Sequence, residues 1–383
     1  MLALGFIVLI TSACMRSNSP FPLIPLSHEG KNPYLVYVSN TEMKIQWQLA
    51  KTDDCTFEWG TSPGTYSNGP FTTAEDSSDD YRHIHSYTIT PLSTGTAYYY
   101  RVLMNGAYHT GSFNAPPSTG ASDLKFIVYG DSQLFAGVHN QVSGSIINTY
   151  NADPLFKTFI LRAGDLTMNG GKEYNWENEL FSPVLDNVQQ LLASVPCISA
   201  PGNHDVGGGL FEKYLPYPFQ GSGYYWSFDY GPAHIAVVDQ YVSYSTGSPQ
   251  LVWLENDLAA STKPWKFIVL HQPGWTATPA GATGHANNPD VQNYIHPLCV
   301  SHGVSFVFAG HNHYYSRAVV DGVQHITTGG GGAPTFDPVP GQPYVVTINR
   351  SYHFCKIEIA GNTLNFTAVR LDGSVIETFA VTK

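Results

Sequence analysis

Five polar clusters in the C-terminal two-thirds of the chain constrain its fold more than any other feature of the sequence. Each cluster follows a short apolar run with the composition of a buried β-strand. In α/β folds, ligands bind beyond the carboxyl ends of strands, so we expect the five clusters to converge on one site. In chain order they are Gly130-Asp131-Ser132-Gln133, Gly164-Asp165-Leu166, Gly202-Asn203-His204-Asp205, Leu270-His271-Gln272 and Gly310-His311-Asn312-His313.

The region that carries these clusters, residues 123–383, alternates between strand-like and helix-like patterns. Helix-like spacing covers residues 137–150 and 173–193. Strands that alternate with helices predict a layered α/β domain. The predicted buried strands are Leu124–Tyr129, Phe159–Ala163, Ala233–Val238, Trp265–Leu270 and Val304–Ala309.

The preceding region, residues 31–117, has a different pattern. Short alternating runs such as 44–48, 85–89 and 97–102 are separated by turn sequences. The chain contains 24 Tyr, 20 Phe, 36 Gly and 26 Pro, a composition that favours strands and tight turns. We therefore expect a separate all-β sandwich here.

The N-terminus, residues 1–14, is an apolar run that ends in small residues and Cys14, and it is too short to span a membrane. It has the form of a bacterial lipoprotein signal, and residues 15–30 form a Ser-, Pro- and Asn-rich linker. We expect an exported cell-envelope lipoprotein, held to the membrane only by its lipid. The alternatives are an ordinary cleaved signal on a secreted protein, or a misplaced start codon.

Charge limits the classes of partner. The formal net charge is −11, which argues against non-specific binding to nucleic acid or to an anionic membrane surface. An anionic substrate would need a local positive centre, and bound metal cations can supply one.

Several motifs carry a resemblance to a known family. Residues 310–317 read Gly-His-Asn-His-Tyr-Tyr-Ser-Arg, and residues 253–258 read Trp-Leu-Glu-Asn-Asp-Leu. With the Gly-Asp-Leu of residues 164–166, these resemble the calcineurin-like metallophosphoesterases, and within them the purple acid phosphatase branch. The resemblance implies a four-layer α/β sandwich preceded by a fibronectin-III-like domain.

The resemblance also implies a ligand set for two metals, which can be Fe, Zn or Mn. Asp165 would bridge both ions. The other ligands would be Asn203, His271 and His311 for one metal, and Asp131 and His313 for the other. A metal-bound hydroxide would then attack a phosphorylated small-molecule substrate.

Three further residues have implied roles near the substrate. His204 would contact the phosphate or the leaving oxygen, with Asp205 orienting its imidazole. A purely structural role for His204 is the alternative. His285, in the Gly- and Pro-rich loop 274–289, would face the substrate, or would simply be an exposed loop residue.

The chain departs from the family pattern at two positions. Met168 stands where the purple branch has its iron-binding Tyr, and Gln133 stands where other metallophosphoesterases have His. The Asp131 metal therefore lacks a usual ligand. Either the Gln133 amide or the His139 imidazole can substitute, or the site stays under-coordinated.

We expect hydrolysis of phosphomonoesters as the activity. A phosphodiesterase or nucleotide hydrolase of the same fold is the first alternative, because the motifs do not separate them. An inactive surface-binding lipoprotein is the second.

Overall fold

The computed structural model describes residues 30–79 and 82–383. The predicted signal, residues 1–14, lies outside these described residues, as does nearly all of the predicted linker, residues 15–30. Within the described ranges, no helix has both the length and the apolar character needed to cross a membrane. The lipid-anchor prediction therefore stays a prediction.

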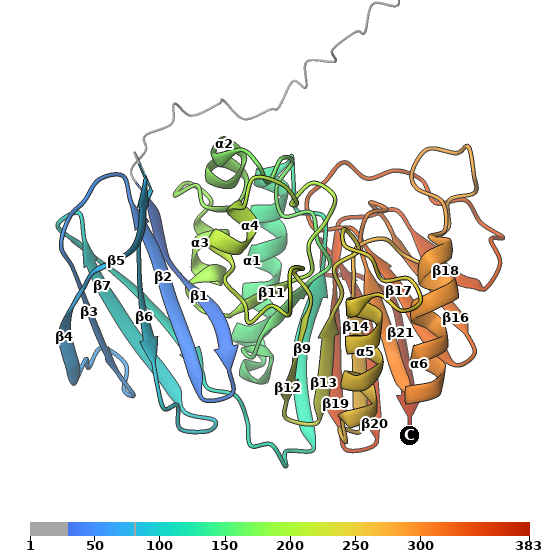
Figure 1. Cartoon of the computed structure of the whole chain (residues 1–383), viewed down its shortest axis with the longest axis horizontal. Helices are drawn as coiled ribbons and strands as arrows, with labels where there is room; N and C mark the ends of the chain where they lie inside the picture. Colours follow the sequence, from blue (N-terminus) through green and yellow to red (C-terminus); the bar gives the residue numbers. More distant parts are fainter. Residues whose placement is uncertain (1–29, 80–81) are drawn as a thin grey trace, which may run out of the picture.

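The N-terminal domain is a sandwich of two four-stranded antiparallel sheets, drawn in blue and teal in Figure 1. Their strand orders are β1-β2-β6-β5 and β4-β3-β7-β8. The bounds are β1 (Lys31–Ser39), β2 (Glu42–Leu49), β3 (Cys55–Gly60), β4 (Asn68–Thr73), β5 (Glu75–Asp79), β6 (Arg82–Ile89), β7 (Ala97–Met104) and β8 (Ala107–Asn114).

Alternating side chains build the core of this sandwich. Along β7 every second residue is buried, as a strand with one face on a core requires. Rings from both sheets stack there: the centroids of Trp47 and Phe57 are 6.2 Å apart, and those of Phe57 and Tyr100 are 5.9 Å apart. The predicted all-β domain is confirmed.

The second domain contains a six-stranded and a seven-stranded sheet, ordered β11-β10-β9-β19-β20-β21 and β12-β13-β14-β15-β17-β16-β18. The strands are β9 (Asp123–Tyr129), β10 (Ile160–Arg162), β11 (Cys197–Ser199), β12 (Trp226–Tyr230), β13 (Ala233–Val237), β14 (Trp265–Val269), β15 (Val304–Ala309), β16 (Tyr315–Val320), β17 (Val323–Thr328), β18 (Val345–Asn349), β19 (His353–Ala360), β20 (Thr363–Arg370) and β21 (Val375–Thr382).

Nine helical segments of the described residues connect these strands. They are α1 (Ala136–Ala152), η1 (Pro154–Phe156), α2 (Glu173–Asn175), η2 (Trp176–Leu180), α3 (Asp186–Leu192), α4 (Leu210–Tyr214), α5 (Pro249–Ala260), η3 (Val291–Ile295) and α6 (His296–His302).

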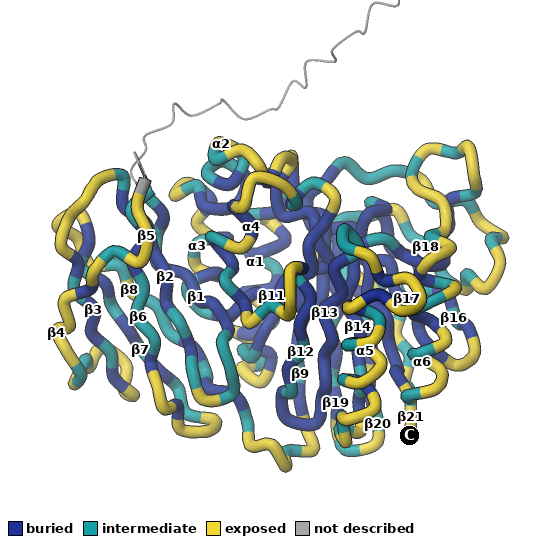
Figure 2. Tube along the Cα trace, in the orientation of Figure 1, coloured by how far each residue is buried: buried dark blue, intermediate teal, exposed yellow. Residues whose placement is uncertain are grey.

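The two sheets of the second domain pack face to face. Phe126 of β9 meets Phe267 of β14 edge-on at 5.5 Å, and Phe306 of β15 stacks on Phe366 of β20 at 6.1 Å. Helices α1 and α3 lie on the side of the N-terminal sandwich, and α5 and α6 cover the opposite side (Figure 1). Strands β13 and β17 are buried along their whole length (Figure 2). The four-layer arrangement is confirmed.

The segment predicted to be one helix, residues 173–193, is broken into α2, η2 and α3. Ser182 and Pro183 separate the last two pieces. Proline lacks an N–H and disfavours helical backbone in the residue before it, so the continuous spacing could not become one helix. This break places the short η2 segment beside the loops of the polar clusters.

Strand direction brings the polar clusters together. Strands β9, β10 and β11 run parallel, and so do β13, β14, β15 and β17. Each sheet therefore presents the carboxyl ends of its parallel strands at one edge. Asp131, Asp165 and Asn203 follow strands of the first sheet, and His271 and His311 follow strands of the second.

Candidate metal centre

The backbone is tightly turned where the clusters begin. Asp131, Asp165 and His311 adopt positive φ angles of 58°, 55° and 68°. Such angles are strained for residues with a Cβ and persist where the surroundings hold them, often at functional sites. A Cβ at Gly164 would lie 2.5 Å from His271 Nδ1, and one at Gly310 would lie 2.2 Å from Asp131 Oδ2. Glycine at both positions lets the two sheets close around the site.

Four donors form what we call the Asn203 half of the centre: Asp165, Asn203, His271 and His311. The potential ligand atoms of Asp165, His271 and His311 all lie within 4.8 Å of one another. His271 Nε2 lies 3.3 Å from Asp165 Oδ2, 3.0 Å from Asn203 Oδ1 and 3.1 Å from His311 Nδ1. One carboxylate, one amide oxygen and two imidazoles therefore face a common point.

The tautomer of His271 is fixed from outside this cluster. Its Nδ1 lies 2.7 Å from the Ala163 carbonyl oxygen, to which only a protonated nitrogen can donate. Nε2 therefore points at Asp165 and Asn203, and its lone pair is available to a cation once the ring is neutral. A backbone carbonyl behind a ligating imidazole is the usual support for a metal ligand.

Three residues form the Asp131 half, which shares Asp165: Asp131, Gln133 and His313. His313 Nδ1 lies 2.9 Å from the Pro334 carbonyl oxygen, so Nε2 faces the centre, 3.7 Å from Asp131 Oδ1. The Gln133 amide donates from Nε2 to Asp165 Oδ2 at 3.1 Å. Its Oε1 is buried without a hydrogen-bond partner. An orphaned oxygen beside two buried carboxylates fits a cation ligand.

Burial and mutual charge perturb the ionisation of these groups. Burial raises the pKa of Asp131 well above its usual range. Burial also opposes ionisation of Asp165, but the nearby His271 outweighs it, and the pKa of Asp165 falls to about 2. Burial and the neighbouring His271 lower the pKa of His311 to about 2. Burial opposes protonation of His271, but the carboxylates of Asp165 and Asp131 outweigh it and raise the pKa of His271 to about 9. A bound cation would take the place of the His271 proton and stabilise the buried acids.

His204 lies at the mouth of the centre. Its side chain is 31% exposed, and its Nε2 is 4.0 Å from Asp165 Oδ2. Nδ1 lies 2.8 Å from the Met168 carbonyl oxygen and donates to it. The other ring nitrogen, Nε2, therefore faces Asp165, which both halves of the centre share.

The expected role of Asp205 was wrong. Its buried carboxylate accepts the backbone N–H groups of Leu166, Thr167 and Gly202, at 2.8, 3.3 and 2.9 Å. Both carboxylate oxygens are therefore occupied by the backbone, and the Met168 carbonyl orients the His204 ring instead. Asp205 is a positioning residue that ties the Asp165 loop to the Asn203 loop.

His285 and His139 occupy different surroundings. The exposed His285 stacks on the ring of His311, with centroids 3.6 Å apart, so loop 274–289 folds back over the Asn203 half. His139 is buried, and its Nε2 is paired with the Tyr129 hydroxyl at 3.0 Å. Of the two candidates for the missing ligand, the structure brings Gln133 to the carboxylates and ties His139 elsewhere.

Two residues next to the centre escaped the sequence analysis. One oxygen of Glu179, in η2, accepts the backbone N–H groups of Leu134 and Met168 at 2.9 and 2.8 Å, and so joins the first two cluster loops. Gln240 Oε1 accepts from His271 N at 2.8 Å. Gln240 follows the buried strand β13, so the strand-end rule could have found it. Glu179 gave no such signal, because its segment had the pattern of a plain helix.

Comparison with known proteins gives family and fold. The calcineurin-like phosphoesterase family matches residues 105–315, and the purple acid phosphatase N-terminal domain matches residues 31–115. Purple acid phosphatase 22 of Arabidopsis thaliana is 29% identical over 346 residues, covering 83% of this chain and 73% of the relative.

Two further proteins are similar. The Fe(3+)-Zn(2+) purple acid phosphatase 12 of the same plant is 26% identical over 255 residues, 62% of this chain and 52% of that protein. The structure of a purple acid phosphatase from yellow lupin superposes with a TM-score of 0.74 at 18% identity, covering 91% of this chain and 74% of the lupin chain. The lupin likeness shows the fold alone.

Proposed function

The chain belongs to the calcineurin-like phosphoesterase family and is a metal-dependent phosphoester hydrolase, and we propose that it hydrolyses phosphomonoesters at a two-metal centre. The observation that carries the proposal is the convergence of Asp165, His271 and His311, with Asp131 and His313 directly beside them. The preference for monoesters is supported by the relatives, which are named as phosphatases.

Two cations suit these residues. Asp165 is shared by both halves and would contact both ions. The first ion would be held by Asn203, His271 and His311. The second ion would be held by Asp131, His313 and Gln133. When bound, the pair would supply the positive charge that phosphate oxygens need and the acidity that makes water a nucleophile. Mixed oxygen and nitrogen donors favour Fe, Zn or Mn, and the Fe–Zn pair in one relative's name agrees with this set.

In this proposal His204 donates a proton to the leaving group. The hydrogen bond from Nδ1 to Met168 keeps that nitrogen protonated and directs Nε2 at the centre. Protonated Nε2 can donate to the departing alkoxide as the ester bond breaks. Asp205 would act only through the loops that it fixes.

The stacked His285 would border the substrate from the other side. Its ring covers His311, and its backbone N–H donates to Asn312 Oδ1 at 2.8 Å. A substrate entering between His204 and His285 would meet one imidazole from the loops that follow each of the two sheets.

We also propose that the protein is exported and anchored by a lipid on Cys14, because residues 1–14 have the form of a lipoprotein signal.

The test is a substrate panel on full-length protein whose metal content has been measured. Phosphomonoesters, nucleotides and phosphodiesters are compared by kcat/KM, with Asp165→Ala as the inactive control. We expect the monoesters to be preferred. A preference for diesters would overturn the monoester proposal, and no turnover with two metals bound would favour a binding protein.

A further inference from the structure

The buried side chain of Glu179, in η2, joins two of the loops that build the metal centre. The residue is only 8% exposed. Its Oε2 accepts the backbone N–H groups of Leu134, after β9, and Met168, after β10, at 2.9 and 2.8 Å. Its Oε1 accepts from the side-chain amide of Asn175 at 2.6 Å. Because two N–H groups from different loops meet on one carboxylate oxygen, Glu179 fixes these loops relative to each other.

Met168 connects Glu179 to the ring of His204. The Met168 N–H donates to Glu179, and the carbonyl of the same residue accepts from His204 Nδ1 at 2.8 Å. His204 Nε2 is 4.0 Å from Asp165 Oδ2, which is too far for a hydrogen bond. The direction of the His204 imidazole therefore depends on the position of the Met168 carbonyl.

A second contact from η2 reaches the backbone of His204. Trp176 Nε1 donates to the Gly170 carbonyl at 2.9 Å, and the Gly170 N–H donates to the His204 carbonyl at 2.6 Å. Side chains of η2 thus hold this loop at residue 168 and again at residue 170. The loop cannot shift away from η2 without breaking buried hydrogen bonds, which is costly.

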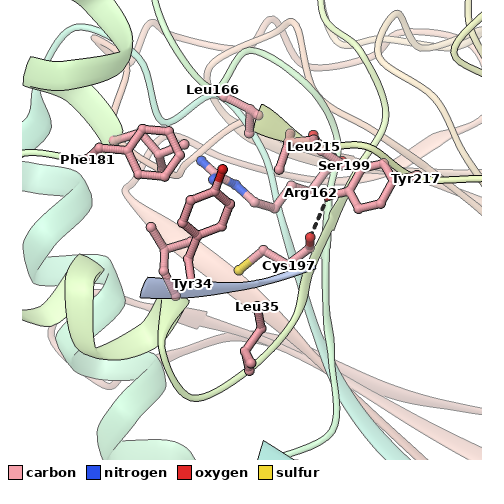
Figure 3. A pocket seen from close by; sticks show the side chains of 11 residues that line it. Tyr34, Leu35, Arg162, Leu166, Phe181, Cys197, Ser199, Leu215 and Tyr217 are labelled. Carbon is pink, nitrogen blue, oxygen red and sulfur yellow. Dashed lines mark hydrogen bonds between the residues drawn. The ribbon is translucent and has the colours of Figure 1, made fainter. Parts of the chain in front are cut away.

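The N-terminal sandwich anchors the segment that carries Glu179. Glu173, in the adjoining α2, pairs with the buried Lys31 of β1. Phe181, the residue after η2, packs on Tyr34 of β1, with ring centroids 4.9 Å apart (Figure 3). Both ends of η2 are therefore fixed by the other domain, which makes η2 a rigid support for the loops of the centre.

We propose that Glu179 is a positioning residue for the donor of the leaving-group proton. It holds the Met168 carbonyl, which keeps His204 Nδ1 protonated and directs Nε2 toward the centre. This role rests on the proposed proton donation by His204. Glu179 contacts no reacting atom, so its effect on the reaction passes through His204. A carboxylate that only stabilised the fold would leave the direction and tautomer of the His204 ring unchanged.

Nitrogen NMR of the zinc-loaded, full-length protein tests the state of the ring directly. Signals of nitrogen-15-labelled histidines distinguish the two neutral tautomers, and loss of a signal in His204→Ala identifies that of His204. At about pH 9, well above the usual histidine range, we expect wild-type His204 to be entirely in the Nδ1–H form. Glu179→Ala should give a mixture of both tautomers. An unchanged single tautomer in Glu179→Ala would overturn the proposal.

Kinetics of the same variant give a second test. In Glu179→Ala we expect kcat for an alkyl phosphate to fall about 10–100-fold. The fall for nitrophenyl phosphate should be smaller, because nitrophenolate leaves without a proton. Glu179→Gln should restore kcat, because an amide oxygen can accept the same two N–H groups. Glu58→Ala, which removes an equally buried carboxylate from the N-terminal sandwich, should not change the ratio of the two rates.

A double variant shows whether Glu179 acts through His204. Glu179→Ala combined with His204→Ala should lose no more kcat than His204→Ala alone. Equal losses for both substrates in Glu179→Ala, or additive losses in the double variant, would make Glu179 a structural residue and overturn the proposal. If Glu179→Ala fails to fold, Glu179→Asp, whose carboxylate is shorter by one methylene group, replaces it in each measurement.

The proposed function and the role of Glu179 fail in different experiments. A wild-type protein with two bound metals and no phosphoester turnover would refute the proposed function. The NMR measurement needs no turnover, so it would still show whether Glu179 orients His204.

Discussion

The two halves of the metal centre differ in how completely their donors are assembled. In the Asn203 half, His271 Nε2 lies within 3.3 Å of three other donors, and a backbone carbonyl fixes its tautomer. In the Asp131 half the imidazole of His313 is 3.7 Å from its carboxylate, and Gln133 offers an amide oxygen that has no partner.

This difference shows how one site can hold two cations unequally. Preorganised donors lose little freedom on binding, so the Asn203 half should bind its ion more tightly. The Asp131 half has a neutral amide in place of an imidazole, and amide oxygen is the weaker and harder donor. The following predictions test the inequality, from the largest expected effect to the smallest.

Removing the shared carboxylate of Asp165 should abolish metal binding in both halves, so that no difference in affinity is left. Asp165→Ala takes a ligand from both halves, so we expect loss of both metals and a fall in kcat/KM on the order of 10⁴-fold or more. Elemental analysis of the purified variant checks the metal content. Two metals per chain in this variant would mean that Asp165 does not bridge the halves.

His204→Ala should leave both halves loaded and impair only the chemical step. We expect kcat to fall roughly 10²–10⁴-fold, because the variant loses its proton donor to the leaving group. An activated leaving group such as a nitrophenolate should lose less, since it needs little protonation. Unchanged turnover with a poor leaving group would make His204 a structural residue. His83→Ala, in the N-terminal sandwich, is the matched control.

Substitutions at Gln133 should change the weaker half alone. Gln133→Ala should lower the affinity of one metal by about 10–100-fold, and Gln133→His should raise it. His139→Ala should leave both affinities unchanged, because that imidazole is paired with Tyr129. Chelator titration followed by metal analysis reads out each site. Equal losses in Gln133→Ala and His139→Ala would reject the assignment of Gln133 to the centre.

The smallest expected effect is on protein stability and comes from His234, a histidine outside the centre. His234 is buried, and its two nitrogens each lie 2.8 Å from a carboxylate oxygen, one of Asp229 and one of Asp257. Burial opposes its protonation, but the two carboxylates outweigh this and raise the pKa of His234.

The sign of its contribution follows from that shift. A pKa raised on folding gives stability that is fully present below about pH 6.5 and is lost as the pH rises through the folded value. His234→Gln should therefore lower stability more at pH 5.5 than at pH 9, without changing metal content or kcat. Thermal unfolding at both pH values measures this, and an equal loss at both would show that His234 is neutral in the fold.

Much of the centre could be predicted because the sequence shows where the buried strands end. The apolar runs before Asp131, Asp165 and His311 are parallel strands, and parallel strands present their carboxyl ends together. The structure brings these side chains together as expected, and their binding of metal stays a prediction. The same rule applied to β13 would have added Gln240.

The contacts of individual carboxylates could not be predicted. Asp205 beside His204 looked like an orienting pair, but neighbours in sequence need not face each other. Three backbone N–H groups of turned loops take up the Asp205 carboxylate instead. The contacts of Glu179 could not be predicted because the helical periodicity of residues 173–193 does not show the break at Pro183. That break places η2, which carries Glu179, against the loops.

Anomalous diffraction from crystals of the metal-loaded protein tests the central claim most directly. Two peaks roughly 3.5–4 Å apart are expected, one against Asn203, His271 and His311 and the other against Asp131 and His313. The second peak should have the lower occupancy and should disappear first when the crystals are soaked in chelator. A single peak, or two peaks that fade together, would contradict the unequal two-metal centre described here.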